Sequence, residues 1–274
     1  MVAIRLSPAG FPMAPSEEVW DALSPEDRAW IFDALPGEVT DAEIAMPEGD
    51  RHFQAKTRAL DSLRGYFARQ RRRVYLAAEL PIYYPAEPRF APDLLAVLEA
   101  EDHPRDKWVV SAEGKGLDWV MEVHVGGDRK KDAERNVARY ARLGISEYFL
   151  YDRGRNQLLA YRLPAPRATT YVPISSEGGR YESRVLGLAV EVDRDRLRFF
   201  AGTAMLLESD ELIARLEQML VVVQQRAEDE SRLREEQTRL REEETRRREE
   251  ETRRREASEL EVARLREELA RLRK

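Results

Sequence analysis

Residues 119–152, WVMEVHVGGDRKKDAERNVARYARLGISEYFLYD, contain the clearest structural pattern of the chain. This stretch begins inside an apolar run, Gly116 to Val125, which is typical of a central strand buried on both faces of a sheet. Two glycines break this strand, and a helix is expected from Asp128, which suits an N-cap, to about Leu143. A second strand follows from Glu147 to Asp152. The stretch therefore predicts two parallel strands joined by a helix in a right-handed crossover.

The elements around this unit extend it into a larger sheet. Helical spacing of apolar side chains predicts a helix from His52 to Gln70. Further strands are expected at Arg73–Glu79, Ile82–Tyr84, Phe90–Leu98, Leu158–Leu163, Thr169–Ile174, Arg180–Ser183 and Ala189–Val192, and more weakly at Gly37–Ile44. This order predicts an α/β fold, a mixed sheet flanked by helices, in a domain spanning residues 37–200.

Residues 1–36 are expected to form an N-terminal helical adaptor. A short helix is predicted from Ser16 through Leu23, and a second helix from Ser24, whose first turn is acidic. The apolar residues of the second helix should pack on the main domain; they are Trp30, Ile31 and Leu35.

Residues 205–274 predict a long, highly charged coiled-coil helix. Apolar residues follow 3-4-3-4 spacing at its start (Ile213, Leu216, Leu220, Val223, Ala227) and again at its end (Val262, Leu265, Leu269, Leu272). Between these ends runs a charged seven-residue repeat, REEETRR in its most regular form, which provides Glu–Arg pairs four residues apart. The tail is either a solvated helical spacer or a coiled coil that joins copies of the chain, or a partner protein, through its apolar ends.

Composition limits the possible functions. The chain holds 46 basic and 52 acidic residues, and 16 of each lie after position 225, so the preceding residues carry the whole net charge of −6. This acidic balance counts mildly against tight binding to nucleic acid. The lack of cysteine excludes disulfides, thiolate zinc sites and a cysteine nucleophile. Without a membrane-length apolar run or a signal pattern, the chain is expected to be cytoplasmic.

Three side chains of the predicted sheet could form a site. Glu122 and His124 are two residues apart in the apolar strand, so both project from one face, and Asp93 starts a neighbouring strand. Two carboxylates from adjacent strands suit Mg²⁺, and a backbone carbonyl near Val123 could add a ligand. His124 or Lys131 could then orient an attacking water or stabilise developing charge. The alternative is structural: Glu122 forms an ion pair with Lys131 or an arginine, without a metal.

Four segments occur in an order that adds to this prediction. They are GEV…MPEGDRH ending at His52, then Pro92-Asp93, then the apolar strand with Glu122, and last DRKKDAERNVARYARLGISEYFLYD from Asp128. With them the chain resembles the Uma-type restriction endonuclease family, in the PD-(D/E)XK nuclease superfamily. The resemblance implies a restriction-endonuclease-like sheet and an endonuclease site dependent on Mg²⁺ or Mn²⁺, with Asp93 and Glu122 as metal ligands. Its expected substrate is nucleic acid, namely DNA.

The chain departs from the family pattern at two positions. The superfamily signature places a lysine two residues after the acid, where this chain has His124. Relatives often carry a lysine four residues before Tyr140, where this chain has Asn136, and Lys131 could substitute from one turn earlier. His52 and Asp132 are further accessory candidates. These departures bear on turnover more than on the fold, so a binding or scaffold protein that has lost catalysis is the second hypothesis.

A cluster of arginines near the end of the first long helix is the best candidate for phosphate contact. It comprises Arg64, Arg69, Arg71, Arg72 and Arg73, with aromatic residues interleaved. The alternative is a solvated helix end.

Overall fold

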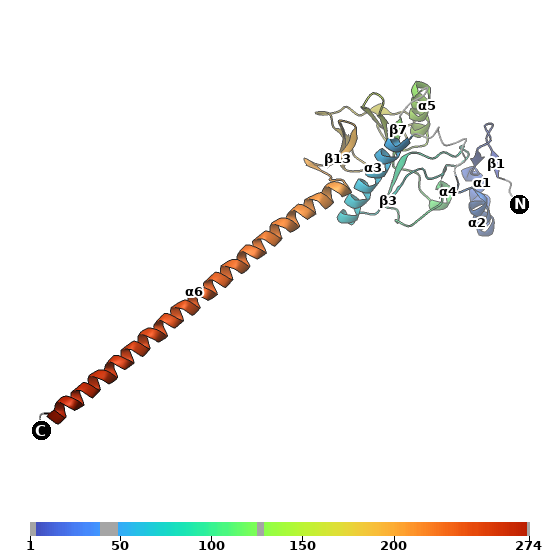
Figure 1. Cartoon of the computed structure of the whole chain (residues 1–274). Coiled ribbons are helices and arrows are strands. Elements are labelled where there is room, and N and C mark those ends of the chain that lie inside the picture. The colour runs from blue at the N-terminus through green and yellow to red at the C-terminus, as the bar shows by residue number, and fades with distance from the viewer. Residues whose placement is uncertain (1–3, 39–48, 125–128, 273–274) are drawn as a thin grey trace. The chain divides into compact units, whose positions relative to one another are not determined.

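The computed structural model describes residues 4–38, 49–124 and 129–272 (Figure 1). The chain divides into two compact units, Met1–Ser209 and Asp210–Lys274. In the described part of the chain, no helix has the length and apolar character needed to cross a membrane.

A six-stranded mixed sheet organises the first unit. Its order is β10 (Val172–Pro173), β9 (Gln157–Arg162), β8 (Glu147–Asp152), β7 (Trp119–His124), β5 (Leu94–Leu98) and β3 (Val74–Ala77). Strands β7 and β8 are parallel and are joined through helix α5 (Arg129–Arg142), whereas the other neighbours are antiparallel. The predicted α/β fold, its parallel strand–helix–strand unit and the central place of β7 are confirmed.

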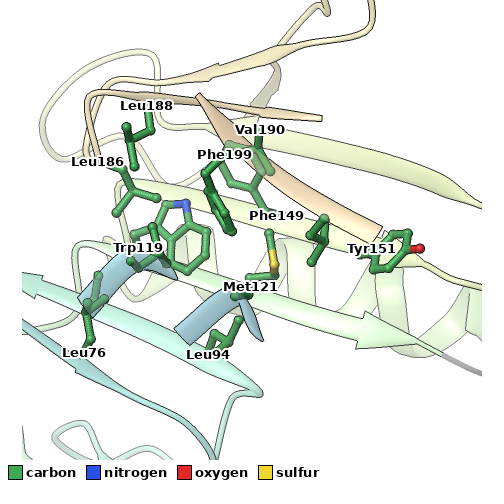
Figure 2. Packing of buried hydrophobic residues seen from close by; sticks show 14 of the residues in the cluster. Leu76, Leu94, Trp119, Met121, Phe149, Tyr151, Leu186, Leu188, Val190 and Phe199 are labelled. Carbon is green, nitrogen blue, oxygen red and sulfur yellow. The ribbon is translucent and has the colours of Figure 1, made fainter. Parts of the chain in front are cut away.

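Helix α3 and a second sheet cover one face of this sheet. The helix spans Gly49–Gln70, and the four-stranded antiparallel sheet runs in the order β11 (Tyr181–Ser183), β12 (Leu188–Asp193), β13 (Arg196–Ala201) and β14 (Ala204–Met205). In the shared core, side chains such as Leu188 and Phe199 lie over Trp119, Met121 and Phe149 (Figure 2). Burial of this apolar surface fixes both layers on β7 and β8.

The other face of the sheet packs against α5 and a short parallel pair of strands. The pair is β4 (Ile82–Tyr83) and β6 (Trp108–Val109), and the one-turn helix α4 (Val110–Glu113) follows it. Tyr140 and Ala141 of α5 belong to the same buried cluster as Ile82 and Trp108. The central strands are therefore covered on both faces, as their apolar sequence predicts.

The N-terminal segment contains a two-stranded sheet and the two expected helices. Its elements are β1 (Arg5–Leu6), β2 (Pro12–Met13), α1 (Glu17–Ala22) and α2 (Pro25–Ala34). The side chains of Ser16 and Ser24 cap these helices by accepting hydrogen bonds from backbone amides.

The helices of this segment pack as expected except at one residue. Ile31 and Leu35 are buried against Tyr83 and Val109. Trp30, in contrast, is 42% exposed, so the prediction that it packs on the main domain is wrong. Neighbouring helical residues point about 100° apart, and Ile31 occupies the buried direction.

Several strand boundaries differ from the predictions. Strand β5 begins at Leu94 rather than Phe90, because Pro92 cannot donate to a ladder and Phe90 forms only an isolated bridge with Ile82. Strands β6 and β13 were not predicted at all. The weak candidate Gly37–Ile44 falls largely outside the described residues.

The second unit is one continuous helix, α6 (Ser209–Leu272). Beyond its first turn, every residue whose exposure is described is exposed. The expected Glu–Arg pairs form between Glu244 and Arg248 at 2.6 Å and between Glu250 and Arg254 at 2.7 Å. Each such pair adds only a few tenths of a kcal/mol to the helix, about 0.2–0.5 kcal/mol.

Candidate active site

The candidate site lies where the ends of β5 and β7 meet, between α3 and α5. Leu94 pairs with Met121 in the antiparallel ladder, so Asp93, immediately before β5, comes alongside Glu122. Side chains from α3 reach Asp93, and a side chain from α5 reaches Glu122. The sheet thus brings together two carboxylates that are 29 residues apart in sequence.

Asp93 is held in its charged form. Its Oδ2 accepts a hydrogen bond from the Val123 amide at 2.7 Å, and its Oδ1 lies 3.2 Å from His52 Nε2 and 3.3 Å from Lys56 Nζ. Burial alone would raise the pKa of Asp93. The hydrogen bonds from His52 and Val123, with the charge of Lys56, outweigh burial and lower this pKa below its ordinary value.

Glu122 is in the opposite electrostatic situation. Its Oε1 accepts a hydrogen bond from the Tyr140 hydroxyl at 2.5 Å, and its Oε2 accepts one from the Asp93 amide at 3.3 Å. Burial and the negative charge of Asp93 nevertheless raise the pKa of Glu122 well above its ordinary value. Burial and the neighbouring Glu122 also raise the pKa of Tyr140, which keeps its hydroxyl protonated as a donor. Neighbouring carboxyl groups with pKa values shifted apart are typical of functional sites.

The alternative for Glu122 is a simple ion pair without a metal. Among the residues whose side chains are described, no lysine or arginine forms an ion pair with this carboxylate. Lys131, the partner considered from the sequence, lies on α5, but its side chain is outside that set.

The sequence analysis missed Lys56 as a site residue. Lys56 is buried on α3 and forms ion pairs with Glu79 and Asp93. Burial lowers its pKa, but these two carboxylates outweigh burial, so the pKa of Lys56 is raised and its charge is retained. A signal was available, because His52 and Lys56 are four residues apart and share one face of a helix.

These residues fit a divalent cation such as Mg²⁺. Asp93 and Glu122 offer hard oxygen atoms side by side, and a nearby positive charge would relieve the burial of Glu122. Among the described residues, no group of three or more His, Cys, Asp or Glu side chains could hold a metal. Mg²⁺ commonly uses only one or two protein carboxylates and keeps several waters, whereas structural zinc requires four ligands.

The other predicted site residues lie on β7 and α5. His124 ends β7, is partly buried like Glu122, and its carbonyl accepts the Arg153 amide at 2.9 Å. Asn136 is partly buried on α5. Asp132 also lies on α5, and its side chain is outside the described set, as is that of Lys131.

The predicted arginine cluster has mixed roles. Arg64 donates to the Leu76 carbonyl at 3.0 Å, and Arg72 donates to the carbonyls of Val185 and Leu186 at 3.2 and 3.3 Å. These two side chains therefore hold α3 to its neighbouring segments. Arg73 lies 3.8 Å from Glu99, whereas Arg69 and Arg71 are exposed at the helix end.

A second arginine group, which was not predicted from the sequence, lines a cavity of about 250 Å³. Arg58 comes from α3, Arg153 follows β8, and Arg196 begins β13; Asp195 and Glu208 supply the acidic lining. The Nε of Arg153 is buried and has no hydrogen-bond partner among the described residues. Gln54 and Ala55, which lie between His52 and Lys56 in the sequence of α3, also line the cavity.

Comparison with known proteins gives a similar solved structure and a matching family. A solved structure titled a "putative nuclease belonging to DUF820", from Anabaena variabilis ATCC 29413, is similar over 57% of this chain and 88% of that chain, with 15% identity and a TM-score of 0.42. No curated protein matches the chain. The Uma2 family, described as "Putative restriction endonuclease", matches residues 26–194, more than half of the sequence. The chain therefore belongs to the Uma2 family.

Proposed function

We propose that this protein is a metal-dependent endonuclease that hydrolyses phosphodiester bonds of nucleic acid, with DNA as the first substrate to test. Membership of the Uma2 family supports the reaction class. The observation that carries the proposal is the pair Asp93 and Glu122, whose adjacent carboxylates have pKa values shifted in opposite directions. Such a pair has no evident structural benefit, since burying like charges together costs stability.

Each residue of the centre has a distinct role in this proposal. Asp93 and Glu122 would hold Mg²⁺ or Mn²⁺, which polarises a phosphodiester and lowers the pKa of a bound water. His52 and the Val123 amide orient Asp93, and Tyr140 orients Glu122. Lys56 keeps its charge beside Asp93 and would stabilise negative charge on the phosphate.

Lys56 provides from α3 the positive charge that the superfamily signature supplies two residues after the acid. Its Nζ lies 3.3 Å from Asp93 Oδ1, which places an ammonium group at the carboxylate pair. His124 and Lys131 remain candidates for orienting the attacking water. In this proposal the centre therefore keeps a cationic group, although position 124 is a histidine.

We further propose that the arginine-lined cavity binds a backbone phosphate next to the cleaved one. Three guanidinium groups and two carboxylates line the cavity, so its lining carries a net positive charge. The buried Nε of Arg153 offers a donor that no described residue uses. Guanidinium groups are well suited to phosphate because they offer several donors in a planar arrangement.

Cleavage of supercoiled plasmid with Mg²⁺ or Mn²⁺ tests the main proposal. The unsubstituted protein should nick the plasmid, whereas Asp93→Ala and Glu122→Ala should each lose at least 100-fold in rate. Asp61→Ala is the matched control, because Asp61 is an exposed carboxylate on α3 outside the centre. Equal rates in the parent and the two site variants would refute the assignment of these carboxylates.

One observation favours a second candidate function, a nuclease-fold scaffold without turnover. His124 occupies the position of the signature lysine, and the chain carries a 64-residue helix with exposed apolar residues at both ends. On this reading α6 joins copies of the chain or recruits a partner protein. A folded, metal-binding protein that leaves plasmid intact would support the scaffold.

A further inference from the structure

The apolar residues at the two ends of α6 share one heptad register. Ile213 and Val262 are separated by 49 residues, which is seven complete heptads, so both occupy the same heptad position, a. Five further residues of the two seams fall on positions a and d of this single register: Leu216, Leu220, Val223, Leu265 and Leu269. All seven side chains are between 45% and 61% exposed. On a straight helix these positions drift by about 20° per heptad, and left-handed supercoiling around a partner would bring them onto one stripe.

The middle of the same stripe is charged in a regular way. Its a positions hold arginine, at Arg234, Arg241, Arg248 and Arg255. Its d positions hold Glu or Gln, at Glu230, Gln237, Glu244 and Glu251. Burying these residues against an apolar partner helix would be costly. A matching partner must place acidic groups opposite the arginines and basic groups opposite the glutamates.

We propose that this partner is a second copy of α6, bound in antiparallel orientation. When two helices run in opposite directions, position a of one faces position d of the other. If Leu216 faces Leu269 of the second copy, then Leu220 faces Leu265 and Val223 faces Val262. The apolar start of each helix is then covered by the apolar end of the other.

The same register also pairs the charged middle of the stripe. Glu230 faces Arg255, Arg234 faces Glu251, Gln237 faces Arg248 and Arg241 faces Glu244 of the second copy. Every arginine at position a thus meets a hydrogen-bond acceptor, three of them carboxylates. A single alignment therefore satisfies both the apolar ends and the charged middle.

Other arrangements of the same two helices are less favourable. A parallel, in-register pair would place arginine against arginine in four layers and glutamate against glutamate in three. An antiparallel pair displaced by one heptad sets Val223 against Arg255 or Val262 against Glu230. These mismatched layers disfavour the other arrangements and leave the full overlap as the best pairing.

Antiparallel pairing has a consequence for the first unit of each chain. Every copy enters the rod at Ser209, and the two copies of Ser209 lie at opposite ends. At 1.5 Å per helical residue, a rod of this length separates them by roughly 90–100 Å. Two nuclease-family units would then work at distant points rather than share one interface.

Cysteine cross-linking of the full-length protein tests the orientation, because the chain contains no native cysteine. Leu220→Cys and Leu265→Cys chains are prepared singly and co-expressed, and the solvent-facing position f is probed by Gln218→Cys. After mild oxidation, the co-expressed pair should form a disulfide-linked dimer. Each single variant and the Gln218→Cys control should remain largely uncrosslinked, because residue 220 lies far from residue 220 of the other copy.

Light scattering on the unsubstituted protein supplies an independent result, which should be the mass of a dimer at micromolar concentration. Efficient cross-linking of Leu220→Cys alone would indicate parallel pairing and overturn the proposal. A monomeric parent protein, or a dimer in which the co-expressed pair does not cross-link, would overturn it as well. None of these readouts depends on nuclease activity, so a failure here is distinct from a failure of the proposed function.

Discussion

At the scale of single residues, the burial of Glu122 beside Asp93 costs stability. The side chain sits beside the charged Asp93, and burial together with this like charge raises the pKa of Glu122. A group with a raised folded-state pKa binds a proton more readily in the folded protein than in the unfolded chain. Ionisation of Glu122 at neutral pH therefore destabilises the metal-free protein, and a bound cation would reverse this effect.

Glu122→Gln should consequently stabilise the metal-free protein at pH 7–8, by on the order of 1–3 kcal/mol. The gain should vanish as the pH falls below the unfolded-state pKa of about 4.3, where Glu122 is neutral in both states. Denaturant unfolding of both proteins across this pH range measures the effect. The variant should also lose the rise in melting temperature that Mg²⁺ or Mn²⁺ gives the parent. A parent that is more stable than the variant at neutral pH would contradict this view of Glu122.

At the scale of single elements, replacing each of two glycines by alanine should have different effects on the stability of the protein. A Cβ at Gly116 would lie 2.6 Å from the Tyr84 hydroxyl, which accepts a hydrogen bond from the Leu117 amide. A Cβ at Gly65, inside α3, would meet only the flexible end of Arg69 at 3.2 Å.

Gly116→Ala should therefore destabilise the protein by about 1–3 kcal/mol, because Tyr84 is buried and must move. Gly65→Ala should instead be neutral or stabilising by up to about 1 kcal/mol, since alanine favours the helix. Urea denaturation of the two variants and the parent distinguishes them. Similar losses in both variants would mean that α3 does not tolerate a methyl group at position 65.

The elements that could be predicted are those whose own sequence shows a clear pattern of apolar and polar residues. The unit β7–α5–β8 is apolar, then amphipathic, then apolar again, and Gly144 ends its helix with a left-handed φ of 75°. Strand β13 was not predicted because polar and apolar residues alternate only in part of its sequence, RLRFFA. Its strand conformation depends on pairing with β12. Pairing between distant segments decides such strands.

The candidate site likewise combines residues that stand out in the local sequence with residues that only the folded chain brings together. Asp93 and Glu122 could be proposed because each stands out as a carboxylate next to or within an apolar strand. Lys56 and Tyr140 could not be assigned so directly, since one contacts Asp93 from α3 and the other contacts Glu122 from α5. Only the packing of both helices on opposite faces of the sheet reveals these contacts.

At the scale of the whole molecule, the distribution of charge sets how nucleic acid can bind. The residues before position 226 carry the entire net charge of −6, so long-range attraction to a polyanion is absent. Binding must then depend on local groups of arginines, such as Arg58, Arg153 and Arg196 in the cavity lining. Few phosphate contacts imply a shallow dependence of affinity on salt.

Arg153→Gln should weaken binding of a labelled DNA duplex by about 5- to 50-fold, a loss typical of one phosphate contact in a partly buried setting. The slope of log affinity against log salt should fall by about 1, as expected when one contact is lost. Arg167→Gln is the matched control, because Arg167 is exposed on a loop away from the cavity lining. Fluorescence anisotropy with Ca²⁺ in place of Mg²⁺ measures binding without cleavage. If both variants lose the same affinity and slope, general charge rather than the cavity governs binding.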